Sequence, residues 1–115
     1  MFIKVNDTIL KAELVDNSST KALKKKLAQG PLTIHMNDYA RMEKVGDLGF
    51  YLPVNDRYTQ TEAKDLILYQ GHFFVIYYAK NYWNFTKLGR IENVSKEELK
   101  KLLGHQDVTV TLSLE

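Results

Sequence analysis

The segment from Asp65 to Arg90 places the strongest constraint on the fold, because it holds the densest block of apolar, aromatic and β-branched residues in the chain. Two such runs, residues 65–69 and 72–79, flank Gln70-Gly71. These residue types fit a pleated, largely buried surface, and a two-residue connection ending in Gly is typical of a tight antiparallel hairpin. We therefore predict a hairpin over residues 65–79, with the core formed around it.

Alternation of apolar and polar residues predicts further strands on both sides of this hairpin. The predicted strands span residues 2–5, 8–14, 32 to about 37, 48–52, 65–69, 72–79, 87–91 and 108–114. Residues 38–46 and 54–64 lack a strand period and predict surface loops, and residues 80–85 set aromatic side chains among loop-forming residues.

Two short helices are predicted from their start and stop signals. Asn17-Ser18-Ser19-Thr20 offers N-cap residues for a helix over about 18–29, which Gly30-Pro31 ends. Ser95 and Glu98 form a capping box, so a second helix begins at Lys96 and ends at Gly104.

The number of strands indicates how the sheet is arranged. A chain of 115 residues is long enough for one domain, and we expect residues 1–115 to form it. About eight mostly antiparallel strands are too many for one flat sheet in so short a chain, and closure removes exposed edges. We predict a mainly β fold, a closed eight-stranded barrel with two short helices capping it, in which the last strand pairs near the first.

Composition excludes several classes of site and partner. The chain has no Cys, which excludes disulfides, thiolate zinc sites and thiol nucleophiles. Its net charge is only +2, with 16 basic and 14 acidic residues interspersed, so no nucleic-acid footprint is present. Lys24-Lys25-Lys26 is interpreted as a solvated helix face. No signal peptide or membrane-spanning run is found, and we expect a soluble cytoplasmic protein without a membrane partner.

Motifs for catalysis are missing from the sequence. His35, His72 and His105 are far apart and lack a second ligand at short spacing, so we expect no metal site and no cofactor. Neither a nucleophile elbow nor a phosphate-binding glycine loop occurs. Asp38 and Glu43 could form a catalytic pair of carboxylates, but we interpret them as turn residues.

Several short motifs in a fixed order resemble those of the small bacterial cyclophilin-like fold proteins. The resemblance runs nearly end to end and is carried by Met36-Asn37-Asp38-Tyr39, Glu43-Lys44, Leu52-Pro53, residues 65–69, Leu88-Gly89-Arg90-Ile91 and residues 108–115. It implies an eight-stranded barrel with a helix at each end. The chain departs from the common family pattern at Ala40-Arg41-Met42 and at Gln70-Gly71, where many relatives carry smaller residues.

The resemblance also raises prolyl isomerisation, which the true cyclophilins catalyse. That reaction needs an apolar pocket and a hydrogen-bond donor, usually Arg, for the twisted amide. The cyclophilin signature of an Arg after Phe-His is absent, and only Arg41, Arg57 and Arg90 are available as substitutes. A divergent peptidyl-prolyl cis-trans isomerase is therefore an alternative function, and the enzyme question stays open.

The aromatic residues of the chain indicate a possible ligand-binding surface. Phe73, Val75 and Tyr77 share one face of their strand, and at least one ring-rich face must lie outside the barrel centre. One interpretation is that helices cover this face; the other is an aromatic groove for a peptide or small apolar ligand. A homodimer contact, in a self-associating protein, is a further alternative. The predicted ligand-binding residues are Tyr39, Arg41, Glu43, Tyr51, Tyr77, Trp83 and Arg90.

Overall fold

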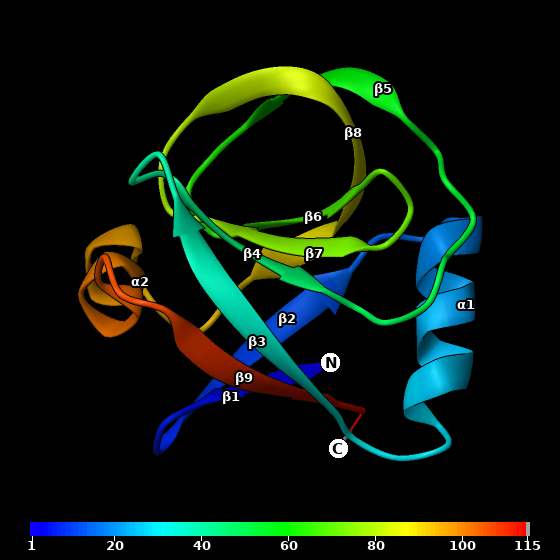
Figure 1. The fold of residues 1–115 in the computed structure, drawn as a ribbon, viewed down its shortest axis with the longest axis horizontal. Coiled ribbons are helices and arrows are strands. Elements are labelled where there is room, and N and C mark those ends of the chain that lie inside the picture. The colour runs from blue at the N-terminus through cyan, green and yellow to red at the C-terminus, as the bar shows by residue number, and fades with distance from the viewer. Residues whose placement is uncertain (115) are drawn as a thin grey trace.

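The structure, a computed structural model, describes residues 1–114 (Figure 1). These residues form nine strands: β1 (Phe2–Val5), β2 (Thr8–Leu14), β3 (Leu32–Tyr39), β4 (Glu43–Asp47), β5 (Arg57–Thr61), β6 (Asp65–Tyr69), β7 (Phe73–Tyr77), β8 (Asn81–Ile91) and β9 (Val108–Ser113). The two helices are α1 (Ser18–Leu27) and α2 (Lys96–Leu103). The predicted mainly β class with two short helices is confirmed. No helix of the described residues is long and apolar enough to cross a bilayer.

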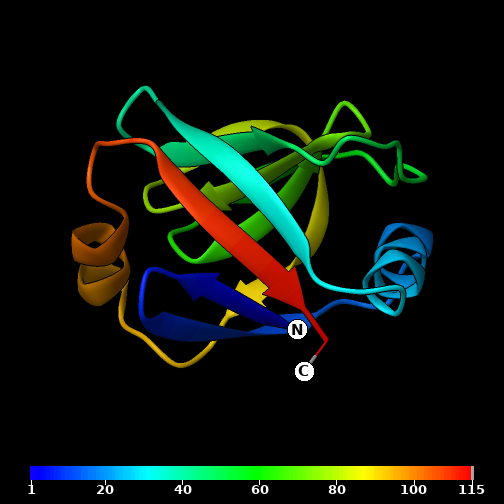
Figure 2. The ribbon, with the colours of Figure 1, turned by 60° about the horizontal axis from the view of Figure 1, so that its bottom comes forward.

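Backbone pairing joins eight of the strands into a ring. The order is β2-β1-β9-β3-β4-β7-β6-β8, and β2 pairs with β8 to close it. Each of these pairs is antiparallel. The predicted meeting of the chain ends is confirmed, because Phe2 on β1 lies opposite Ser113 on β9 (Figure 2). β5 pairs with β8 outside the ring.

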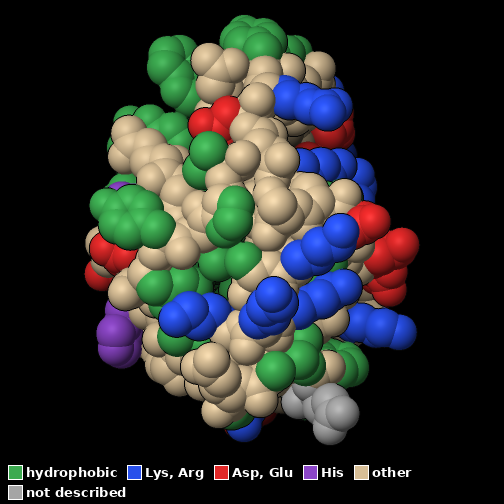
Figure 3. Space-filling view, turned by 90° about the vertical axis from the view of Figure 1, so that its right-hand side faces the viewer, with side chains coloured by type: hydrophobic (Ala, Val, Ile, Leu, Met, Phe, Trp, Pro, Cys, Tyr) green, Lys and Arg blue, Asp and Glu red, His purple; other side chains and the backbone are tan. Residues whose placement is uncertain are grey.

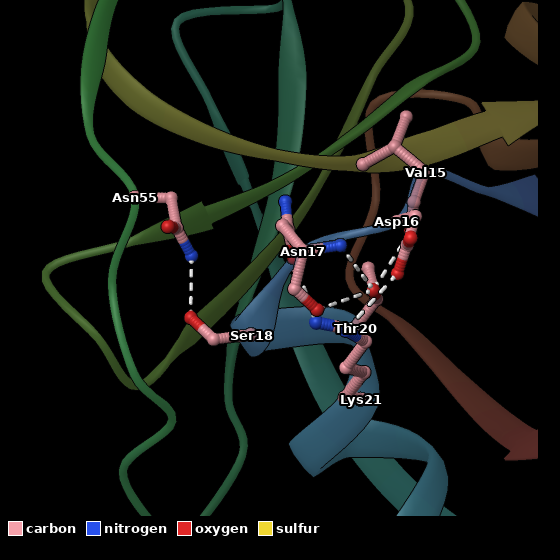
Figure 4. Close-up of polar contacts among 7 residues, drawn as sticks. All are labelled: Val15, Asp16, Asn17, Ser18, Thr20, Lys21 and Asn55. Carbon is pink, nitrogen blue, oxygen red and sulfur yellow. Dashed lines mark hydrogen bonds and ion pairs between the residues drawn. The ribbon is translucent and has the colours of Figure 1, made fainter.

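Both helices begin with a capping box. The Asn17 side chain accepts a hydrogen bond from the Thr20 amide at 2.8 Å, and Thr20 Oγ1 accepts one from the Asn17 amide at 3.2 Å (Figure 4). Asn55 Nδ2 donates to Ser18 Oγ at 2.8 Å, which ties the start of α1 to the segment before β5. At α2 the predicted capping box of Ser95 and Glu98 is confirmed. The Ser95 amide donates to Glu98 Oε1 at 2.9 Å, and the Glu98 amide donates to Ser95 Oγ at 3.1 Å.

The helices pack on the core from opposite sides of the ring (Figure 1). Leu23 and Leu27 of α1 and Leu99 and Leu103 of α2 are buried in the same hydrophobic cluster as the inward side chains of the strands. The polar face of α1 is in solvent, as predicted: Lys24–Lys26 are exposed, and several basic side chains gather on this side of the molecule (Figure 3).

The prediction for residues 38–52 was wrong. The strand there is β4, whereas residues 48–52 form no strand. The charged residues of β4 suggested a loop, yet Glu43 and Lys44 are buried. β4 also contains Gly46, at a point where β3 passes very close. A Cβ at this position would stand 2.7 Å from the His35 carbonyl oxygen, so only glycine fits.

Two further segments for which no strand was predicted are strands. β5 lies within residues 54–64, and β8 begins at Asn81, within the segment of mixed aromatic and Asn residues. Residues 81–85 of β8 pair with β5 and the remainder pairs with β6 and β2. β5 is polar because it is an edge strand that is largely exposed, so it carries no hydrophobic period.

The central hairpin has a longer turn than predicted. Tyr69 lies opposite Phe73, so the connection is the three residues Gln70, Gly71 and His72. Gln70 and Gly71 both have positive φ, at 53° and 79°, and the His72 amide donates to the Tyr69 carbonyl at 3.3 Å. The strand pairing that we predicted for this hairpin is confirmed.

Candidate functional site

A cavity of about 740 Å³ lies on the outer side of the ring. Its walls are the outward side chains of β3, β4, β6 and β7 and the first half of β8, which curves away from the ring and arches over β6 and β7 (Figure 1). We call it the outer cavity. Because side chains alternate along a strand, residues 43, 45 and 47 of β4 and residues 73, 75 and 77 of β7 all face it.

Strand register brings three of these residues into one row. Tyr39 on β3 lies opposite Glu43 on β4, and Glu43 lies opposite Tyr77 on β7. Directly opposed side chains on one face of a sheet are neighbours in space. The carboxylate of Glu43 is therefore set between two tyrosines at one end of the outer cavity.

The floor of the cavity is apolar. Ile67, Val75, Tyr77 and Phe85 form a buried cluster that is separate from the main core. The Phe85 ring lies 5.7 Å from the Tyr77 ring and 5.9 Å from the Tyr69 ring, between centroids. These contacts hold the first half of β8 against the outer face of β6 and β7, so β8 covers the face that we expected helices or a ligand to cover.

Exposed aromatic rings border the opening of the cavity. Tyr39 is 62% exposed, Tyr82 52% and Trp83 56%, although each also lines the cavity. A ring that is half in solvent and half over an apolar floor gains burial when a ligand enters. This arrangement suits an apolar or aromatic ligand of moderate size.

The carboxyl group of Glu43 has an unusual electrostatic setting. The residue is only 7% exposed. Burial raises the pKa of the carboxyl from 4.5 to about 7; a hydrogen bond with Tyr77 opposes the rise, and the Asp38 carboxylate adds to it. A buried group that exchanges a proton near neutral pH, inside a cavity, is a candidate for ligand contact or proton transfer.

Lys44, next in sequence, points to the other side of β4 and is fully buried. Its Nζ donates to Asp38 Oδ1 at 2.9 Å, to the Gly104 carbonyl at 3.0 Å and to the Gln106 carbonyl at 2.5 Å. The Tyr78 hydroxyl also donates to Asp38. Burial tends to raise the pKa of Asp38, but these two hydrogen bonds outweigh it and hold that pKa below its ordinary value. The network fixes β3, β4 and Tyr78, the residue after β7, to the segment after α2.

The structure brings four of the seven predicted ligand-binding residues to the outer cavity. These are Tyr39, Glu43, Tyr77 and Trp83. The interpretation of Glu43 as a turn residue was wrong, because it lies in β4 and is buried.

The other three predicted residues lie elsewhere. Arg41 is exposed in the turn between β3 and β4, where its φ is 56°. Tyr51 is 75% exposed and contacts His72, with 4.8 Å between ring centroids. The Arg90 Nη1 atom lies 4.0 Å from Asp65 Oδ1 in an ion pair.

Several residues of the cavity were missed. Tyr69 shares the outward face of the central hairpin with Tyr77, so alternation alone could have identified it. Asn81, Tyr82 and Phe85 lie in a segment for which no strand was predicted, and nothing in their pattern placed them over β7.

Metal-binding groups are not clustered in the part of the chain that the structure describes. Within residues 1–114 no three His, Asp or Glu side chains come close enough to hold a metal ion. The ring nitrogens of His35 and His72 contact Thr109 at 2.9 Å and Asp47 at 3.2 Å, and the His105 ring lies 6.3 Å from that of Tyr78.

Comparison with protein families gives a match over nearly the whole chain. The model of the cyclophilin-like family matches residues 3–115, which include every residue of the outer cavity. No curated protein and no solved structure matches the chain.

Proposed function

The chain belongs to the cyclophilin-like family, and on this premise we propose that it is a cytoplasmic ligand-binding module whose binding site is the outer cavity. In this proposal the ring of eight strands is a closed cyclophilin-like barrel, and the ligand is a peptide side chain or a small, largely apolar molecule. The observation that carries the proposal is the combination of an apolar floor with an exposed aromatic rim around a volume of about 740 Å³. Pockets that hold small ligands have this size and lining.

A neutral hydrophobic dye, N-phenyl-1-naphthylamine, tests the proposal. We expect its fluorescence to rise when it enters the cavity of the wild-type protein, because the floor excludes water. Val45 is half-buried and faces the cavity, so Val45→Phe fills space there and should weaken dye binding by about tenfold or more, the equivalent of losing roughly 1.4 kcal/mol of contact.

Thr33→Phe is the matched control for this experiment. Thr33 is exposed on the same face of β3 but lies outside the cavity, so this variant should bind the dye like the wild type. Equal dye binding by all three proteins, or none by the wild type, would count against the outer cavity as a binding site.

Prolyl isomerisation is less well supported by the geometry. The cavity offers an apolar floor for a proline ring, but among the described residues no Arg lines it. In a coupled isomerisation assay we expect the uncatalysed rate, unchanged in Arg41→Ala and Arg90→Ala. A rate well above background that either variant lowers would favour the isomerase.

Self-association uses the same exposed rings. Tyr39, Tyr82 and Trp83 would be covered if two copies met at the rim. Light scattering at two concentrations distinguishes this alternative, since a dimer would form at the higher concentration and compete with the dye.

A further inference from the structure

Charge in the outer cavity has one sign. Three of the lining residues are acidic, namely Asp38, Glu43 and Asp47, and none of the described lining residues is Lys or Arg. This is unusual for a protein with a net charge of +2, whose basic side chains outnumber the acidic ones. Because Asp38 is paired with Lys44 on the opposite face of the sheet, the negative charge that faces the cavity comes from Glu43 and Asp47, and it favours cations over anions.

Two of the three carboxylates already have partners. Asp38 accepts hydrogen bonds from Lys44 and Tyr78. Asp47 Oδ1 accepts from the Gly49 amide at 2.9 Å and lies 3.2 Å from His72 Nδ1. Neither carboxylate needs a ligand to satisfy it.

Glu43 differs because no described residue serves as its counter-ion. It takes part in no salt bridge within residues 1–114, and its polar neighbour is the Tyr77 hydroxyl. It is more than nine-tenths buried at the wall of the cavity. Burying a carboxylate without a cation is unfavourable, and a ligand cation placed there would remove that cost.

The rings beside Glu43 favour the same kind of ligand. Tyr39 lies opposite Glu43 in the sheet, and Tyr82 and Trp83 stand on the rim. Aromatic ring faces attract cations, while the apolar floor of Val75 and Phe85 accepts a hydrocarbon body. A carboxylate prefers a cation that can donate N–H hydrogen bonds.

We propose that the outer cavity binds an organic cation that has an apolar body and a primary ammonium or guanidinium group, with Glu43 as its counter-ion. This inference rests on the proposed function, because it names the ligand class for the same cavity. The cation can belong to a free amine or to a Lys or Arg side chain of a peptide; the chemistry at Glu43 is the same for both.

Binding of such a cation should depend on pH. The pKa of Glu43 is raised to about 7 by burial, whereas an alkylamine stays protonated to about pH 10. Affinity should rise as the pH increases through 7, because the carboxylate must be ionised, and binding at pH 6 should release a proton. The other titratable groups that line the cavity are His35, Asp38, Tyr39, Asp47, Tyr69, Tyr77 and Tyr82, and His72 contacts Asp47.

The test compares three probes of matched shape by calorimetry: 2-phenylethylamine, 2-phenylethanol and 3-phenylpropionate. At pH 8 we expect the amine to bind about tenfold or more tightly than the alcohol, and the acid to bind weakest. At pH 6 the amine should bind more weakly, and its heat of binding should vary with the ionisation enthalpy of the buffer. A blocked Ala-Lys-Ala peptide distinguishes a free amine from a peptide side chain as the source of the cation. It should bind better than 2-phenylethylamine only if the natural cation is a peptide side chain.

Glu43→Gln identifies the counter-ion. This variant should lose the preference for the amine and the pH dependence but keep its affinity for the alcohol. Glu13→Gln is the control, since Glu13 is exposed on β2, and it should behave like the wild type. If the alcohol binds as tightly as the amine, or if Glu43→Gln keeps the preference, the inference about the cation is wrong while the binding site stands. If neither these probes nor the dye binds, the proposed function fails as well.

Discussion

Gly89→Ala is expected to destabilise the protein by about 3 kcal/mol or more, or to prevent folding, because overpacking against rigid backbone is among the costliest core changes. Gly89 on β8 lies opposite Leu14 on β2, at the pairing that closes the ring. A Cβ at this position would stand 2.1 Å from the Glu13 carbonyl oxygen. Backbone atoms of two paired strands cannot move apart without breaking the ring.

Urea unfolding followed by circular dichroism measures this effect. Asn84→Ala is a suitable control, since Asn84 is exposed on the same strand, and it should change the free energy of unfolding by less than about 0.5 kcal/mol. A loss below about 1 kcal/mol in Gly89→Ala would contradict the close contact of β2 with β8.

Lys44→Met is the second change with a large expected effect, a loss of about 3 to 5 kcal/mol in the free energy of unfolding. Methionine has a similar length and fills the same space, but it cannot donate hydrogen bonds. It would leave the Asp38 carboxylate without its cation and the carbonyls of Gly104 and Gln106 without a donor. Removing one partner of a buried ion pair costs more than removing both.

The double variant Asp38→Asn, Lys44→Met tests this reason. It should be more stable than Lys44→Met alone, because the unpaired carboxylate is gone. Lys25→Met, at an exposed position of α1, should be close to wild type. If the double variant is as unstable as the sum of its two single changes, the ion pair does not act as described.

Local patterns in the sequence predicted the parts of the fold that depend on neighbours in the chain. The turn at Asn6, with φ of 54°, the capping box of Ser95 and Glu98, and the period of two in residues 108–114 each need only a few adjacent residues. The closing of the ring also followed, because β1 and β9 each carry one apolar face.

The remaining elements depend on contacts that are distant in the sequence. β4 contains Glu43 and Lys44, whose burial is made possible by Tyr77 on β7 and Asp38 on β3. Strand propensity of such residues is set by their surroundings, so the chain alone indicated a loop. The same holds for residues 81–85, which form a strand because Phe85 packs on Tyr77 and because β5 pairs with them.

The candidate site could be predicted in part for the same reason. Tyr39, Tyr77 and Trp83 were predicted as ligand-binding residues because aromatic side chains had to lie outside the barrel centre, and they do line the outer cavity. The charge of the cavity was not foreseen, because it results from the register that sets Glu43 between β3 and β7 and leaves Arg41 and Arg90 outside.

The most direct test of the account is the titration of the Glu43 side-chain carboxyl carbon by NMR, assigned by comparison with Glu43→Gln. The burial of this group beside Tyr77 in the outer cavity predicts a midpoint near pH 7 in the free protein. A midpoint near 4.5, the value of an ordinary solvated glutamate, would contradict the burial of this carboxylate without a counter-ion and with it the proposed cation site.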